Sequence, residues 1–175
     1  GTDGTTALHW AVHRDDVGIG AALIAAGADV NRNNRFGAMP LALASENGSV
    51  AFIDMLLEAG ANPNAATPEG ETVLMTVART GRAAAVQLLI DHGAKPNLAE
   101  GWREQTALMW AAAENNLAAV DVLLAGGANV QARSSGGFSP LMFAVRAGHK
   151  DMAALLIDAG ASPEETLLDG TSALV

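Results

Sequence analysis

The stretch from Leu23 to Asn31 reads LIAAGADVN, and its last seven letters return in related form along the chain. The strings that correspond to AAGADVN at residues 25–31 are EAGANPN (58–64), DHGAKPN (91–97), AGGANVQ (125–131) and DAGASPE (158–164). A second string, TTAL at residues 5–8, returns as AMPL (38–41), ETVL (71–74), QTAL (105–108), FSPL (138–141) and TSAL (171–174). Its leucines lie 33, 33, 34, 33 and 33 residues apart. Two strings that recur in one register predict an array of repeated units.

Each unit is predicted to hold two helices joined by a turn and followed by a loop. Hydroxyl residues precede the first helix in four units, where their oxygens can accept free backbone N–H groups: Thr6, Thr72, Thr106 and Ser139. Met39 takes this place in the second unit and is expected to cap its helix worse, by about 1 kcal/mol. Glycines close most helices, and Asp15 and Asn115 take the place of glycine after two of the first helices, as residues that tolerate left-handed geometry.

This pattern resembles the ankyrin repeat, whose signature is a TPLHxA string, a GH pair and an LLxxGAdvN string with a period of about 33 residues. TALHWA at residues 6–11, GH at residues 148–149 and LIAAGADVN match it closely. The resemblance implies an all-α solenoid of helix-turn-helix units with projecting β-turn or hairpin loops. We expect a single array over residues 1–175, with repeats near 1–33, 34–66, 67–99, 100–133 and 134–166 and a partial sixth at 167–175. The extra residue before Thr106 is expected in the loop near Leu98 to Arg103.

The composition narrows the classes of function. The chain has 19 acidic and 10 basic residues and a formal net charge of −9, which argues against binding nucleic acid. No apolar run approaches the ~18 residues that suggest a membrane-spanning helix, so no membrane insertion is expected. The absence of cysteine excludes disulfides and thiol nucleophiles. We expect a cytoplasmic protein, with an extracytoplasmic bacterial setting as the alternative.

His9 and His13 stand one helical turn apart, a spacing that can hold zinc. Trp10 follows His9 where the HEXXH motif has glutamate, and no third ligand is evident. His9 also occupies the signature histidine position, which the resemblance implies is structural. We therefore expect no metal, no cofactor and no catalytic residue, since nothing in the sequence resembles an activated nucleophile or an acid–base pair.

A stack of repeats presents an extended concave surface instead of a deep cleft. The resemblance implies that a protein or peptide partner docks there, on the loop tips and the first helices. Positions on this surface that differ between units are free of the shared fold and are candidates for recognition. These candidates are His13, Arg14, Arg35, Phe36, Glu46, Glu71, Arg79, Trp102, Arg103, Gln105, Glu114, Phe138 and Arg146.

Two groups of aromatic residues are of interest on this surface. Trp102 lies beside Arg103 in the loop with the extra residue, and we expect it to be exposed because a loop tip offers little core for an indole. Trp and Arg are both enriched among binding hot spots. Trp10, Trp110 and Phe143 lie on the first helices, where we expect them to fill space between helices; an aromatic stripe on the binding surface is the alternative.

Two further hypotheses stand beside that of an interaction module. The chain starts inside a loop and ends inside a helix, which favours a regulatory or targeting arm of a larger protein, including an enzyme. The end repeats are also candidates for self-association with other copies. The first repeat is expected to fray because it lacks an N-terminal neighbour, and the second to be a weak link because of Met39.

Overall fold

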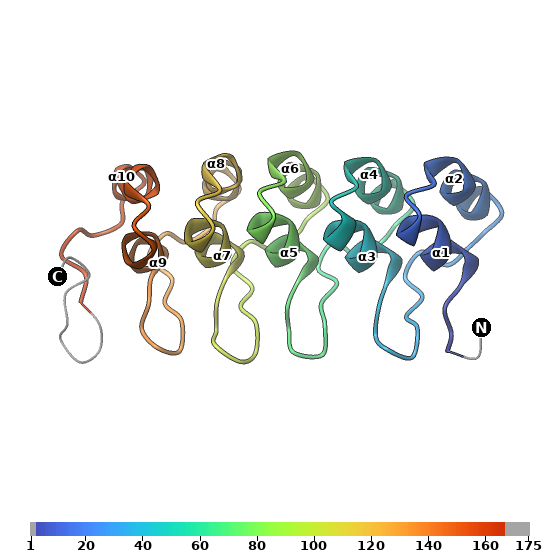
Figure 1. Ribbon diagram of the computed structural model, residues 1–175, viewed down its shortest axis with the longest axis horizontal. Coiled ribbons are helices and arrows are strands. Elements are labelled where there is room, and N and C mark those ends of the chain that lie inside the picture. The colour runs from blue at the N-terminus through green and yellow to red at the C-terminus, as the bar shows by residue number, and fades with distance from the viewer. Residues whose placement is uncertain (1–2, 167–175) are drawn as a thin grey trace.

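The computed structural model describes residues 3–166 and shows helices arranged in successive pairs (Figure 1). Over these residues the helices are α1 (Ala7–His13), α2 (Val17–Ala25), α3 (Pro40–Asn47), α4 (Val50–Glu58), α5 (Val73–Arg79), α6 (Ala83–Asp91), α7 (Ala107–Ala113), α8 (Leu117–Ala125), α9 (Pro140–Ala147) and α10 (Lys150–Asp158). They confirm the predicted all-α solenoid, and over the described residues they form five pairs. The predicted partial sixth repeat, 167–175, lies outside the described residues.

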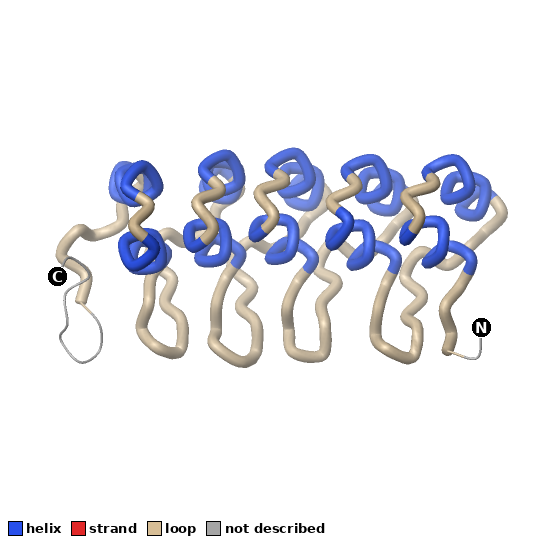
Figure 2. Tube along the Cα trace, in the orientation of Figure 1, coloured by secondary structure: helices blue, strands red, loops and turns tan. Residues whose placement is uncertain are grey.

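The units stack in chain order, with the first helix of each pair in one row and the second in another (Figure 1). Helices pack within a pair, as α1 does on α2, and along the rows, as α5 does on α7. All the loops between units project to the same side, below the row of first helices (Figure 2). This arrangement gives the molecule one long face made of loop tips and first helices.

The core runs along the whole stack because every unit contributes the same two leucine positions. The leucine of the TTAL-like string is at most 2% exposed in every unit: Leu8, Leu41, Leu74, Leu108 and Leu141. Its counterpart on the second helix is fully buried in the last four units: Leu56, Leu89, Leu123 and Leu156. Burial between neighbouring units therefore supplies the stability that one unit cannot supply alone. Among the described residues, no helix is long and apolar enough to span a membrane.

The predicted helix caps are mostly confirmed. The hydroxyls of Thr6, Thr72 and Ser139 each accept the backbone N–H three residues later, at 3.4, 3.2 and 3.2 Å. Met39 caps α3 without any side-chain bond, as expected. The prediction is wrong for Thr106, whose Oγ1 is buried and has no hydrogen-bond partner in the described part of the chain.

The turn residues behave as their types suggest. Asp15 and Asn115 have φ of 53° and 58°, in the left-handed region that glycine occupies in the other units. The hairpin loops of the third and fourth units are closed by isolated antiparallel bridges, Ala66 to Thr72 and Ala99 to Thr106. The second bridge encloses one residue more than the first, so the extra residue lies in this loop, as predicted.

Candidate functional site

The loop tips and first helices form one continuous surface, which we call the loop face, and every predicted contact residue lies on it or at its edge. Ten of the thirteen are exposed: His13, Arg14, Arg35, Phe36, Glu46, Arg79, Trp102, Arg103, Glu114 and Arg146. The other three, Glu71, Gln105 and Phe138, are half-buried. The binding role assigned to these residues stays a prediction.

We number each loop by the unit whose first helix it precedes. The tip of the fourth loop is built around a buried carboxylate, Glu100, which is only 7% exposed. Its Oε2 accepts the backbone N–H of Trp102 at 2.7 Å, and its Oε1 accepts those of Arg103 at 2.8 Å and Gln105 at 3.1 Å. A single side chain thus satisfies three backbone donors and holds the tip in one shape.

Sequence reasoning missed Glu100, although a signal for it exists. In the other loops the corresponding residue is Asn34, Thr67 or Ser134, and its side-chain oxygen accepts the N–H four residues later. Only the loop with the extra residue has a side chain as long as glutamate at this position, because the acceptor must there reach a donor five residues away.

The pKa of Glu100 follows from the same contacts. Burial alone raises the pKa of this carboxyl, but the backbone N–H bonds from Gln105, Trp102 and Arg103 outweigh it, and the nearby Arg103 charge adds to them. The pKa of Glu100 is therefore lowered from its ordinary value, and the group is a carboxylate at neutral pH.

The shape of this tip presents Trp102 and Arg103 to solvent. The Trp102 side chain is 79% exposed, as predicted, and the Arg103 guanidinium carbon lies 5.0 Å from its ring centroid. The tip is tied to both neighbouring loops, because Gly101 N–H donates to Glu69 O at 2.7 Å and Ser135 N–H donates to Arg103 O at 2.8 Å. Glu104 has φ of 55°, a left-handed conformation that is unfavourable for glutamate and that glycine adopts at the corresponding position of the neighbouring loops, Gly70 and Gly137.

The tip of the second loop carries a similar pair of an arginine and an aromatic residue, but within residues 3–166 it is hydrogen-bonded to only one neighbouring loop. Phe36 is 70% exposed, and the Arg35 guanidinium carbon lies 5.0 Å from its ring centroid. Arg35 N–H donates to Asp3 O at 2.8 Å, which ties this loop to the first. The next loop has Pro68 where the fourth has Gly101, and proline has no N–H to donate, so this link is missing between the second and third loops.

A hollow of about 300 Å³ at the middle of the loop face brings together four of the predicted residues, Glu71, Arg79, Gln105 and Glu114. An Arg79 nitrogen lies 3.9 Å from a Glu71 oxygen, and its guanidinium carbon lies 5.4 Å from the Trp110 ring centroid. Trp110 Nε1 is buried there with no hydrogen-bond partner among residues 3–166. The hollow therefore offers side chains of both charges and an aromatic wall.

Two smaller hollows continue along the same face. One of about 280 Å³ includes Phe36, Glu46 and Glu71 in its lining, and another of about 240 Å³ includes Trp10 and His13. The remaining predicted residues, among them Arg14, Arg103 and Arg146, lie outside these three hollows.

The aromatic residues of the first helices differ in burial. Phe143 is 8% exposed and Trp110 is half-buried, which agrees with their predicted role as space fillers. That prediction is wrong for Trp10, which is 56% exposed. His13 and Leu43 line the same hollow but leave most of the indole in solvent. Phe138 packs against Phe143 with ring centroids 5.7 Å apart and Arg146 over both rings, so less of it is available than of Phe36 or Trp102.

The histidine pair is explained by the fold. His9 is 1% exposed; its Nδ1 lies 2.7 Å from Thr6 Oγ1 and its Nε2 lies 3.0 Å from Ala38 O. Nδ1 thus bonds the cap residue of its own helix and Nε2 joins the first unit to the second, which confirms the structural interpretation of His9. His13 is exposed and meets the Trp10 ring edge-on at 5.9 Å. Residues 3–166 contain no group of three or more His, Asp or Glu side chains placed to bind a metal ion.

Comparison with known proteins adds one match. The family model for ankyrin repeats in three copies matches residues 1–67, 41–134 and 92–166. These overlapping matches extend over all five units of the stack. No curated protein sequence matches the chain.

Proposed function

Because the chain belongs to the ankyrin repeat family, we propose that it is a non-enzymatic interaction module that binds a protein or peptide partner on its loop face. Ankyrin repeats are generally protein–protein interaction modules and are typically non-enzymatic. Membership of the family does not say which part of the surface binds, and the proposal for the loop face rests on the side chains that this face exposes.

The observation that carries the proposal is the pair Trp102 and Arg103, which is exposed yet held in place. Exposing a large indole is unfavourable for an isolated protein, since apolar surface is better buried. Trp and Arg are the side chains most enriched at binding hot spots. The three bonds to Glu100 and the links to both neighbouring loops fix the tip before binding, which reduces the entropy lost when a partner docks.

We propose that the partner lies along the stack, with Trp102 as the central contact. Phe36 and the hollow lined by Glu71, Arg79 and Glu114 are the flanking contacts. An interface of ordinary size covers about 800 Å² on each partner. The exposed charges, Glu46, Glu114, Arg14 and Arg146, then set specificity and association rate more than affinity.

The test compares three baits in a capture experiment from lysate of the source organism. The first is the unchanged chain, the second carries Trp102→Ala and Arg103→Ala, and the third carries Ile157→Ala and Lys150→Ala. The third is the matched control, because it also removes an exposed apolar side chain and a cation, but from α10 in the row of second helices. Circular dichroism should show the same helix content in all three.

We expect a protein that the first and third baits retain and the second loses. Binding of this protein, once purified, should weaken by about 30-fold or more in the second bait, the size of a hot-spot loss. Equal affinity of all three baits, or loss only in the third, would contradict binding on the loop face. A turnover activity of the purified chain would contradict the non-enzymatic assignment.

We also propose that the partner is not nucleic acid and that the module works in the cytoplasm. The excess of 19 acidic over 10 basic residues supports the first point, because phosphate binding needs clustered cations. Fluorescence microscopy of the tagged chain in its source organism tests the second.

A further inference from the structure

The outer face of the first unit leaves exposed a position that is buried in every later unit. Ile19 on α2 is 54% exposed. The residues at the corresponding position of the later units, Phe52, Ala85, Ala119 and Met152, are all fully buried. Phe52 packs against Gly20 of the preceding unit, so Ile19, its equivalent, lies where a preceding unit would pack.

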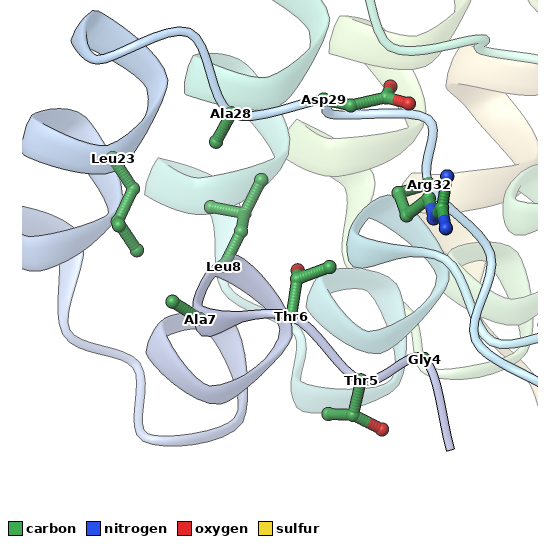
Figure 3. A pocket seen from close by; sticks show the side chains of 9 residues that line it. All are labelled: Gly4, Thr5, Thr6, Ala7, Leu8, Leu23, Ala28, Asp29 and Arg32. Atoms are coloured by element: carbon green, nitrogen blue, oxygen red, sulfur yellow. The ribbon is translucent and has the colours of Figure 1, made fainter. Parts of the chain in front are cut away.

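Three more residues of the first unit line a hollow of about 490 Å³, and two of them repeat this contrast (Figure 3). Leu23 is only half-buried, although its counterparts from Leu56 to Leu156 are fully buried. Ala7 is exposed, whereas the residue that starts the first helix is buried in all four later units. Ala28 lies beside Leu23 and Leu8 at the rim (Figure 3). The end of the stack therefore exposes apolar positions that the internal junctions bury, with the charged residues Asp29 and Arg32 also lining the hollow.

A recurring pair of hydrogen bonds joins neighbouring units at the internal junctions. Between the first two units, Asn31 Nδ2 donates to Gly60 O at 3.0 Å, and Asn31 Oδ1 accepts the N–H of Asn62 at 2.8 Å. Asn64 bridges to Gly93 and Lys95 in the same way, at 3.1 and 2.8 Å. Asn97 bridges to Gly127 and Asn129 at 2.9 and 2.7 Å. One carboxamide thus joins each of these units to the next.

The first unit presents the receiving half of this bridge. Gly27 O corresponds to Gly60 O, and the N–H of Asp29 corresponds to that of Asn62. Within residues 3–166 neither group has a hydrogen-bond partner. An acceptor and a donor thus lie beside an apolar hollow, in the arrangement that a carboxamide and a packed helix pair complete at the internal junctions.

We propose that this end of the stack is an interface for one more ankyrin-type repeat, which carries Asn or Gln at the position of Asn31 and is joined ahead of Gly1 in the same polypeptide. The interface continues the four internal junctions, which all join units linked by a loop. The apolar part of the contact centres on four side chains, Ile19, Leu23, Ala7 and Ala28, which is small for an interface between separate chains. Covalent linkage removes this difficulty, because it makes the association intramolecular.

A second copy of the chain fits this end poorly. Its last complete unit has Glu164 where the others have Asn or Gln. A carboxylate has no hydrogen to donate to Gly27 O, and it would place a negative charge beside Asp29. Head-to-tail stacking of copies therefore lacks the bridge that the internal junctions have.

The experiment extends the chain with a unit of known sequence. A copy of residues 67–99 is placed directly ahead of Gly1, which puts the copied Asn97 29 residues before Gly27, the spacing that separates Asn31 from Gly60 and Asn64 from Gly93. Hydrogen exchange of α1 and α2 is then measured in the original and extended chains. We expect exchange of these helices to slow by about tenfold or more in the extended chain, since local opening must now break a complete junction.

Two matched variants separate a specific junction from general stabilisation. Ile19→Lys should change exchange little in the original chain, where the side chain is mostly in water, and should remove the gain in the extended chain. Asn97→Asp in the copied unit alone should remove part of the gain. No slowing in the extended chain, or a gain that survives Ile19→Lys, would overturn the proposal. So would a dimer of the original chain in sedimentation that Ile19→Lys dissociates, because the occupant would then be a second copy.

Discussion

Gly20 and Phe52 form a small–large pair across the junction between the first two units, and exchanging their sizes tests how the stack is packed. A Cβ added at Gly20 would lie 2.4 Å from Phe52 Cε1 and 2.7 Å from Cζ. The corresponding pairs in the next two junctions have the opposite order, Ile53 with Ala85 and Val86 with Ala119. Gly20→Val with Phe52→Ala therefore gives the first junction a pair that the molecule already uses elsewhere.

The magnitudes follow from burial. Phe52 is fully buried, and truncating such a phenylalanine to alanine costs about 3–5 kcal/mol. Gly20 is also buried, and Gly20→Val alone must displace a ring that has no room to move, an overpacking that costs about 1–3 kcal/mol. In the double variant the valine fills part of the cavity. We expect the double variant to be more stable than Phe52→Ala alone, with a coupling energy of about 1–3 kcal/mol.

Urea unfolding followed by circular dichroism measures the free energies of the four proteins in the cycle. Gly18→Val is the control for helix propensity, because a Cβ at Gly18 meets only Asp16 Oδ1, at 3.6 Å. A double variant less stable than Phe52→Ala, or single variants whose effects simply add, would refute the argument that these two residues share one space.

Three further predictions concern single side chains. Glu100→Gln replaces one of two acceptor oxygens by a donor that faces backbone N–H groups and should cost about 1–3 kcal/mol in urea unfolding at pH 7. Because the folded-state pKa of Glu100 is lowered, the stabilisation from its carboxylate is present above the ordinary value of 4.5 and is lost as pH falls through the folded pKa. The difference in free energy of unfolding between the unchanged chain and Glu100→Gln should therefore narrow on acidification below pH 4.5. A difference that widens would contradict the lowered pKa. Met39→Thr supplies the missing cap of α3, whose backbone at Met39 is already extended, and should raise the free energy of unfolding by about 1 kcal/mol; an unchanged urea midpoint would show that the cap is not limiting. Thr106→Val removes a buried hydroxyl without a partner and should be neutral or stabilising by up to about 1 kcal/mol. Thr72→Val removes a hydroxyl that caps its helix and should cost about 1 kcal/mol. Equal losses of stability at the two sites in thermal unfolding would count against this difference.

Several features of the candidate site follow from the sequence, because they depend on a residue's own position in its unit. The exposure of Trp102 and Phe36 is predictable, since a loop tip has no core beside it. The structural role of His9 follows from its place in the signature string, although its bond to Ala38 O in the next unit does not. The location of the extra residue follows from the 34-residue step between Leu74 and Leu108.

Other features depend on what a neighbouring unit places alongside, and these the sequence does not give. Trp10, Trp110 and Phe143 occupy the same position in three units, yet their burial ranges from mostly exposed to buried. The half-burial of Phe138 depends on Phe143, and the lack of a bond at Thr106 depends on how its side chain packs. The support that Glu100 gives to Trp102 depends on the path of an irregular loop, which has no sequence period to reveal it.

The sequence by itself therefore determined the unit, its helices, its turns and the order of stacking, because a period of about 33 residues and the local chemistry of caps and glycines are written in each unit separately. Only the tertiary structure decided which aromatic rings reach solvent, that Glu100 holds the Trp102 tip, and that the first unit ends in an open junction. The physical reason is that burial and hydrogen bonding in a stack belong to pairs of neighbouring units. A residue's environment is complete only when the unit beside it is known.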